Sequence, residues 1–313
     1  MTAELIWRWL EAGELELPLP GSGHTGRRWS KLAALTEHDV VAGRLAEAHA
    51  DATAILAELS GPTPQHGQLW GVWAAEAPDA VVVAHHDGNG IELEGTKAWC
   101  SGAGLCTHAL VTARRDDDMR GLYAVDLKQP HVIPLTRSWR NAGMCDSDTR
   151  SVQFTNAPAV EVGGPGRYLD RAGFWHGAIG VAACWLGGAR GVAAPLYHAV
   201  GDEHGSASRD VHAHAHLGAV DAALAGAEAM LWSAAAYVDA TPQDGRAELI
   251  ARRVRAVVEH SVDEAITRTG RALGPTPLAL DAKHAQRVAD LAIYVRQSHA
   301  ERDLAALGRA AAR

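Results

Sequence analysis

The sequence has few cysteines and lacks the short signatures of several common enzyme classes. Its 313 residues include four cysteines, none of them in a CxxC pair: Cys100, Cys106, Cys145 and Cys184. A disulfide framework is therefore not expected, and a reducing, cytoplasmic setting is predicted. The motifs GxSxG and HExxH and the P-loop are also absent. This removes the motif-based grounds for an α/β-hydrolase, a zinc protease or a P-loop nucleotidase.

Positive charge is also in short supply. The chain has 29 Lys and Arg against 37 Asp and Glu, a net charge of -8. This balance predicts no nucleic acid and no anionic membrane as a partner. The opening MTAELIWRWLEAGE contains acidic groups and no cleavable apolar core, so no signal peptide is expected. The least polar stretch, 177–196, is interrupted by Arg190 and is interpreted as a buried helix, not as a membrane span.

Aromatic residues make up only 5% of the chain, yet tryptophan is abundant among them, with 10 Trp against 5 Tyr and 2 Phe. One of these lies in the stretch LEGTKAWCSGAG, which is typical of a strand, a tight turn and a second strand. Strand alternation would place Trp99 and Ser101 on one face, and Ala98 and Cys100 on the other. An indole beside a hydroxyl can bind a flat heterocycle. Alternation alone nevertheless favours an ordinary core tryptophan, because core aromatics are the commoner case.

Three regions with different periodicity follow one another along the chain. Residues 1–66 show helical spacing, with one apolar stripe made of Leu45, Ala48, Ala52, Ile55, Leu56 and Leu59. Residues 67–162 contain short runs of β-forming residues separated by turn signals, and residues 163–313 return to helical spacing. We therefore expect an α+β fold with N-terminal helices, a central antiparallel barrel or sandwich and C-terminal helices.

Local signals refine this expectation at three places. Asp87-Gly88-Asn89-Gly90 predicts a hairpin turn between two strands. Gly274-Pro275 predicts the end of a long helix, and a final helix is expected over roughly 281–307. No internal repeat is evident.

Two groups of histidines are candidates for chemistry. On a helix, only His212 and His216 of His212-Ala213-His214-Ala215-His216 share a face, without a carboxylate or cysteine at ligand spacing. A solvated surface is favoured over a metal site, and no metal is predicted. The C-terminal region carries His299 among many charged residues. These are typical of a solvated helix face, but His299 could act as an acid or base if it projects into a cleft.

Several segments, in collinear order from about Ala42 onward, resemble the acyl-CoA dehydrogenase family. Residues 94–101, EGTKAWCS, are similar to that family's NG-x-K-x-W-I-[ST] strand, and GVWAAEAP at 71–78 is similar to its A-x-T-E-P segment. GMCDSDTRSVQFTNAPA at 143–159 resembles the strand before the C-terminal bundle, and the helix that begins near His214 resembles a bundle helix.

The resemblance implies a C-terminal four-helix bundle, a homodimer or homotetramer, and FAD as the cofactor. It places Trp99 against the flavin and Ser101 near the reactive edge of the ring, with Cys100 between them. It also implies backbone contacts to the flavin from Ala75 and Glu76. The implied reaction is oxidation of a small-molecule substrate, an acyl-CoA or other acyl thioester, by hydride transfer to the flavin.

The sequence departs from the family in ways that leave the reaction open. Ala75 replaces the family's threonine, the GSD loop is missing before Gly95, and the R-x-x-F-G motif that grips FAD is not recognisable. The usual catalytic glutamate has no counterpart, and Ala289-Asp290 before His299 resembles the R-D…H pattern of the branch that contains flavin monooxygenases. The alternatives are therefore a dehydrogenase with His299 as its base, a flavin-dependent monooxygenase, and a degenerate, non-catalytic partner subunit.

Overall fold

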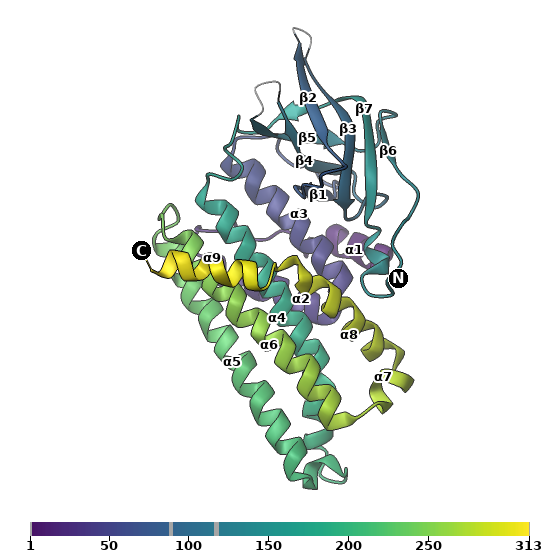
Figure 1. The fold of residues 1–313 in the computed structure, drawn as a ribbon, viewed down its shortest axis with the longest axis vertical. Helices are drawn as coiled ribbons and strands as arrows, with labels where there is room; N and C mark the ends of the chain where they lie inside the picture. Colours follow the sequence, from purple (N-terminus) through teal and green to yellow (C-terminus); the bar gives the residue numbers. More distant parts are fainter. Residues whose placement is uncertain (1, 88–89, 116–118, 313) are drawn as a thin grey trace. The chain divides into compact units, whose positions relative to one another are not determined.

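A computed structural model describes residues 2–87, 90–115 and 119–312 of the chain. Its elements follow the expected order of helices, strands and helices (Figure 1). They divide into two compact units. The first, the β-unit, comprises Met1–Leu17, Leu45–Arg140 and Cys145–Phe174. The second, the helical unit, comprises Pro18–Arg44, Asn141–Met144 and Trp175–Arg313.

The N-terminal helices are divided between the two compact units. They are α1 (Thr2–Glu11), α2 (Thr25–His38) and α3 (Val40–Glu58). Helix α2 belongs to the helical unit, whereas α1 and most of α3 belong to the β-unit. The reason is the apolar stripe predicted on α3, which is buried along its whole length and packs with Trp70, Leu110 and Leu122 of the sheet. The burial of this stripe is the main free-energy gain that ties α3 to the strands.

The β-unit is built around an eight-stranded sheet in the order β6-β7-β3-β2-β4-β5-β8, with β1 paired to β4. The strands are β1 (Trp70–Trp73), β2 (Val82–Asp87), β3 (Gly90–Cys100), β4 (His108–Arg114), β5 (Arg120–Asp126), β6 (Val132–Pro134), β7 (Arg150–Pro158) and β8 (Val160–Glu161). Most pairs are antiparallel, as expected, but β1 and β2 each run parallel to β4. The central sheet is thus mainly antiparallel, with two parallel pairings to β4.

The predicted hairpin joins β2 and β3, which pair in register from Val82 opposite Gly95 to Asp87 opposite Gly90. The central turn residues 88–89 lie outside the described residues. One face of the sheet carries an apolar core that contains Trp73, Leu93, Tyr123 and Phe154. The other packs against α3, so the sheet is apolar on both faces and its strands are dominated by buried side chains.

The helical unit contains three long helices, α4 (Ala172–Gly201), α5 (Val211–Ala240) and α6 (Ala247–Leu273). Helix α4 is long and apolar enough to cross a membrane by length and composition, but 78% of its most apolar stretch is buried within the protein. This burial confirms the interpretation of 177–196 as a core helix. Helix α6 ends at Leu273, as predicted, because Gly274 takes a φ of +65° and Pro275 follows.

The last part of the chain is not the single helix expected over 281–307. The short α7 (Thr276–Leu280) precedes α8 (Ala282–Tyr294), and α9 (Glu301–Ala311) follows after a break. At the break, the Ser298 hydroxyl donates a hydrogen bond to Glu259 of α6 at 2.5 Å, and Ala300 has a φ of +46°. This side-chain bond to another helix, together with the left-handed residue, interrupts a sequence whose local pattern is helical throughout.

Candidate functional site

The strand β3 is bulged at the tryptophan that the sequence singles out. Lys97 and Cys100 are both buried, at 2% and 0% exposure, while Trp99 between them is 61% exposed. The pairing with β7 shifts register between Lys97 and Cys100, and Trp99 has a φ of +61°. Trp99 and Cys100 thus point to opposite faces, as expected, but the bulge places Lys97 and Cys100, three residues apart, on the same inner face, which strict alternation would not do. It also turns a large aromatic side chain outward, in a backbone conformation unusual for tryptophan.

The bulge presents Trp99 beside a second tryptophan and a line of hydroxyl groups. Trp139 meets Trp99 edge to face, with ring centroids 6.2 Å apart and an interplanar angle of 89°. The Ser101 hydroxyl lies 3.0 Å from that of Thr149, which lies 2.7 Å from that of Ser147. We call Trp99, Trp139, Ser101 and Thr149 the Trp99 surface. An open indole face next to neutral hydroxyls suits a planar ligand with polar edges.

Ser101 is held in place through its backbone. Its carbonyl oxygen accepts a hydrogen bond of 3.0 Å from the indole Nε1 of Trp73, a residue of β1. Its own N–H donates to the Trp99 carbonyl at 3.1 Å, and the following Gly102 N–H donates to the Ser147 carbonyl at 2.8 Å. The turn after β3 is therefore anchored on both sides. This anchoring pre-organises the Ser101 hydroxyl beside the indole.

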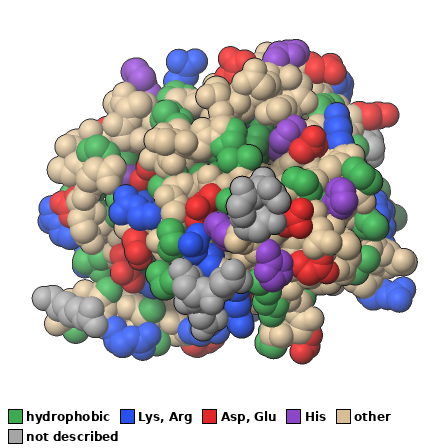
Figure 2. Space-filling model, turned by 90° about the horizontal axis from the view of Figure 1, so that it is seen from above, with side chains coloured by type: hydrophobic (Ala, Val, Ile, Leu, Met, Phe, Trp, Pro, Cys, Tyr) green, Lys and Arg blue, Asp and Glu red, His purple; other side chains and the backbone are tan. Residues whose placement is uncertain are grey.

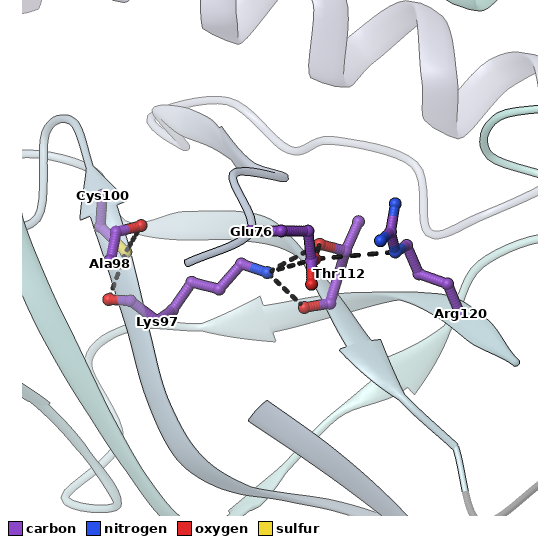
Figure 3. Close-up of polar contacts among 6 residues, drawn as sticks. All are labelled: Glu76, Lys97, Ala98, Cys100, Thr112 and Arg120. Carbon is purple, nitrogen blue, oxygen red and sulfur yellow. Dashed lines mark hydrogen bonds and ion pairs between the residues drawn. The ribbon is translucent and has the colours of Figure 1, made fainter. Parts of the chain in front are cut away.

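The inner side of the bulge carries a buried lysine network (Figure 3). Lys97 Nζ donates to the carbonyl and hydroxyl oxygens of Thr112 on β4, both at 2.8 Å, and to Glu76 Oε1 at 3.2 Å. Arg120 Nε lies 3.6 Å from the same Glu76 oxygen. The network joins β3 and β4 to the segment after β1. Fixing this segment places Ala75 and Glu76, two predicted contacts of the cofactor.

Burial and charge set the protonation of this network. Burial lowers the pKa of Lys97, partly offset by the charge and hydrogen bond of Glu76. Burial alone would raise the pKa of Glu76, but the Lys97 ammonium, the Arg120 guanidinium and the Thr112 hydroxyl outweigh it and lower that pKa below its usual value. Glu76 is thus held ionised and is a weak proton acceptor.

The side chain of Cys100, a predicted cofactor-binding residue, lies on the buried face of the strand. Its thiol is buried and donates to the Lys97 carbonyl at 3.3 Å, and burial raises its pKa. Ala75 and Glu76 are both exposed.

A second carboxylate, which the sequence did not single out, supports the same turn. Asp148 is buried and accepts from Arg150 Nε at 2.8 Å, from Arg150 Nη2 at 3.1 Å and from the Gly104 N–H at 2.8 Å. Arg137 Nη2 lies 2.8 Å from it. A Cβ on Gly104 would come within 2.6 Å of the Asp148 carboxylate, so glycine is needed there. Asp148 and Arg150 lie two residues apart, whereas Arg137 lies farther back in the chain and no spacing rule links it to them.

Asp148→Asn is expected to destabilise the fold at neutral pH and to lose that effect in acid. Burial opposes ionisation, but the hydrogen bonds from Arg150 and Gly104 and the charges of Arg150 and Arg137 lower the pKa of Asp148 below its ordinary 3.8. The ionised group therefore stabilises the fold above the unfolded-state pKa, and this contribution disappears as the pH falls through the folded-state pKa. Urea denaturation from about pH 7 to about pH 3 checks this. The stability advantage of the wild type over Asp148→Asn should shrink in acid, and an advantage that stays constant contradicts the assignment.

The remaining predicted catalytic residue lies in the other unit. His299 falls in the break between α8 and α9 and not on a helix, and its side chain is 62% exposed. Its Nδ1 lies 3.6 Å from Asp303, and its backbone N–H donates to that carboxylate at 3.0 Å. Among the described residues, no group of three or more His, Cys, Asp and Glu side chains is placed to hold a metal.

The surface shown in Figure 2 carries acidic and basic side chains interspersed, with histidines among them. No region of a single sign dominates the described side chains of that face. His212 and His214 at the start of α5 are exposed, which agrees with the solvated surface expected there.

Comparison with solved structures identifies the architecture. The chain is similar to TdsC, the dibenzothiophene monooxygenase of Paenibacillus sp. A11-2, in its complex with FMN and indole (TM-score 0.81, 18% identity, 98% of this chain and 94% of that chain). It is also similar to the methanesulfinate monooxygenase MsuC of Pseudomonas fluorescens (TM-score 0.75, 17% identity, 98% and 95%). A third similar structure is the electron transferring flavoprotein of Acidaminococcus fermentans (TM-score 0.83, 15% identity, 99% and 90%). The fold is that of the acyl-CoA dehydrogenases.

The acyl-CoA dehydrogenase-like fold explains the collinear sequence resemblance from Ala42 onward. No protein-family model and no curated protein sequence matches the chain. At identities below a fifth, the likeness establishes the fold and leaves activity to be argued from the site.

Proposed function

We propose that this protein is a flavin-dependent monooxygenase and that the Trp99 surface forms one wall of its flavin site. The observation that carries the proposal is the bulge that turns an indole outward beside neutral hydroxyls, at 61% exposure. Backbone strain of this kind is retained where the surrounding structure or the function requires it. The FMN-bound and monooxygenase structures among the similar folds support the same assignment and favour FMN over the FAD expected from the sequence.

The residues present fit a flavin. The exposed Trp99 face would stack on the isoalloxazine ring and exclude water from one side of it. The hydroxyls of Ser101 and Thr149 would donate to its polar edge, and the backbone at Ala75 and Glu76 would provide further contacts. When bound in reduced form, the flavin supplies two electrons that, with O2, place one oxygen atom on the substrate and release the other as water.

The protonation of the carboxylates favours monooxygenation over acyl-CoA dehydrogenation. Removal of an α-proton requires a base with a pKa near the working pH. Glu76 and Asp148, the carboxylates attached to this wall, both have a lowered pKa and are engaged by cations. Both are therefore poor bases, whereas oxygen transfer from the flavin needs no strong protein base. The substrate is proposed to be a small molecule.

The second candidate is the oxidation of an acyl thioester with His299 as the base. It is favoured by the sequence similarity of 94–101 and by the exposed imidazole of His299. A homodimer or homotetramer in the cytoplasm is part of both proposals, and light scattering during gel filtration measures its size.

The deciding experiment combines flavin binding with an isotope label. The full-length protein is titrated with FMN, mixed with chemically reduced FMN under 18O2, and offered a panel of small aromatic heterocycles, sulfinates and amines. A product that gains one 18O atom supports the monooxygenase. Anaerobic bleaching of the bound flavin by acyl-CoAs, without labelled product, supports the dehydrogenase. Failure to bind any flavin supports the non-catalytic partner subunit.

A further inference from the structure

The carboxylate of Asp148 is saturated by donors, while the arginines around it are not. Four hydrogen bonds and ion pairs reach its two oxygens, from Arg137, from Arg150 twice and from the Gly104 N–H. This equals the number of acceptor sites of a carboxylate. Arg137 uses one N–H and Arg150 two of the five that each guanidinium carries. With respect to the described part of the chain, the cluster therefore keeps unused donors.

The net charge of the cluster also favours the binding of an anion. Two guanidinium groups meet one carboxylate, which leaves a net charge of +1 in the cluster. Including the neighbouring Asp146 and Arg140 of the same stretch adds one charge of each sign and leaves the sum unchanged. The side chain of Arg137 is 61% exposed, whereas that of Asp148 is 4% exposed. The excess positive charge is thus presented to solvent by a guanidinium that a buried carboxylate orients.

The cluster belongs to the same rigid turn as the Trp99 surface. Asp148 binds the Gly104 N–H, three residues after Ser101, and Thr149 next to Asp148 contacts the Ser101 hydroxyl. Arg137 stands two residues before Trp139, whose ring packs on Trp99. Arg137 is therefore linked to the Trp99 surface through this turn and through Trp139.

We infer that Arg137, oriented by Asp148 and supported by Arg150, recognises the phosphate monoester of flavin mononucleotide. This inference rests on the proposed function and adds a cofactor preference to it. Guanidinium groups bind phosphate through paired N–H donors, and orientation by a second group reduces the entropy lost on binding. The subsite takes the place of the family's phosphate-gripping motifs that the sequence lacks.

The test compares FMN with riboflavin, which has the same ring and no phosphate. Fluorescence quenching titrations of the full-length protein are expected to show FMN bound about 10- to 100-fold more tightly, an advantage that falls as the salt concentration rises. Arg137→Gln should remove most of this advantage and leave riboflavin affinity unchanged. Arg137→Lys should restore part of it. Arg114→Gln, at the exposed end of β4, is the matched control and should keep the advantage in full.

The titrations distinguish failure of the phosphate subsite from failure of the flavin proposal. Equal affinity of the wild type for FMN and riboflavin, or an FMN advantage that survives in Arg137→Gln, overturns the phosphate subsite and leaves the flavin proposal standing. Failure to bind either flavin overturns both. Coenzyme A is a second possible source of the phosphate, and titration with it distinguishes the two. If coenzyme A binds in an Arg137-dependent way and FMN shows no advantage over riboflavin, the assignment of the subsite to the cofactor is overturned.

Discussion

Trp99→Ala is expected to weaken flavin binding by about 10- to 100-fold, because stacking of a heterocycle on an aromatic side chain contributes about 1–3 kcal/mol. The indole is 61% exposed, so its removal takes away little of the core. The loss should therefore appear in ligand affinity and not in folding. Quenching of FMN fluorescence, titrated with the purified variant, measures the change directly.

Two further substitutions at the same position separate stacking from backbone effects. Trp99→Phe retains a flat ring that can still stack on the flavin. Because the whole stacking contribution is about 1–3 kcal/mol, flavin affinity should stay within about 10-fold of the wild type. Trp99→Gly removes the ring and relieves a φ of +61°. Relief of the backbone strain stabilises the folded state by about 1–2 kcal/mol. This offsets the loss of the ring contact with Trp139, which contributes about 0.5–1.5 kcal/mol to folding.

The glycine variant should therefore unfold at nearly the wild-type urea concentration while losing flavin affinity as severely as the alanine variant does. Wild-type affinity in Trp99→Ala, with the fold intact by circular dichroism, would show that the flavin does not lie on this indole.

Lys97→Met is expected to lower the free energy of unfolding by about 1–3 kcal/mol, because it leaves the buried carbonyl of Thr112 without its donor. The loss of the ion pair with Glu76 adds to this, although Glu76 keeps Arg120 as a partner. Methionine nearly preserves the length of the side chain, so packing changes little. Urea denaturation with circular dichroism detection measures the effect.

Exposed Lys128, in the same unit, provides the matched control, and Lys128→Met should change the free energy of unfolding by less than about 0.5 kcal/mol. The double variant Glu76→Gln with Lys97→Met should cost less than the sum of the two single variants, because the residues interact directly. Additive effects, or a Lys97→Met protein as stable as the wild type, would refute the role of this network in holding the segment after β1.

Sequence periodicity predicted most of the secondary structure for identifiable reasons. The apolar stripe of α3 and the end of α6 at Gly274-Pro275 depend on spacing and on local φ preferences, and both are as expected. The break at Ser298 was missed because its cause lies on another helix, at Glu259. Helical spacing likewise does not say which surface a stripe will cover, and the structure alone divides the N-terminal helices between the two units.

In the candidate site, too, some features were predicted from the sequence and others were decided only by the tertiary structure. Strand alternation in the sequence singled out Trp99 and Ser101, and the resemblance to the acyl-CoA dehydrogenases implied Ala75 and Glu76, while the order of helices and strands followed from periods of 3.6 and 2. Only the tertiary structure decided that Trp99 faces outward while Cys100 is buried, since a bulge depends on the pairing with β7. Only it joined Arg137, Asp148 and Arg150, because salt bridges form between side chains that folding brings together, whatever their separation along the chain.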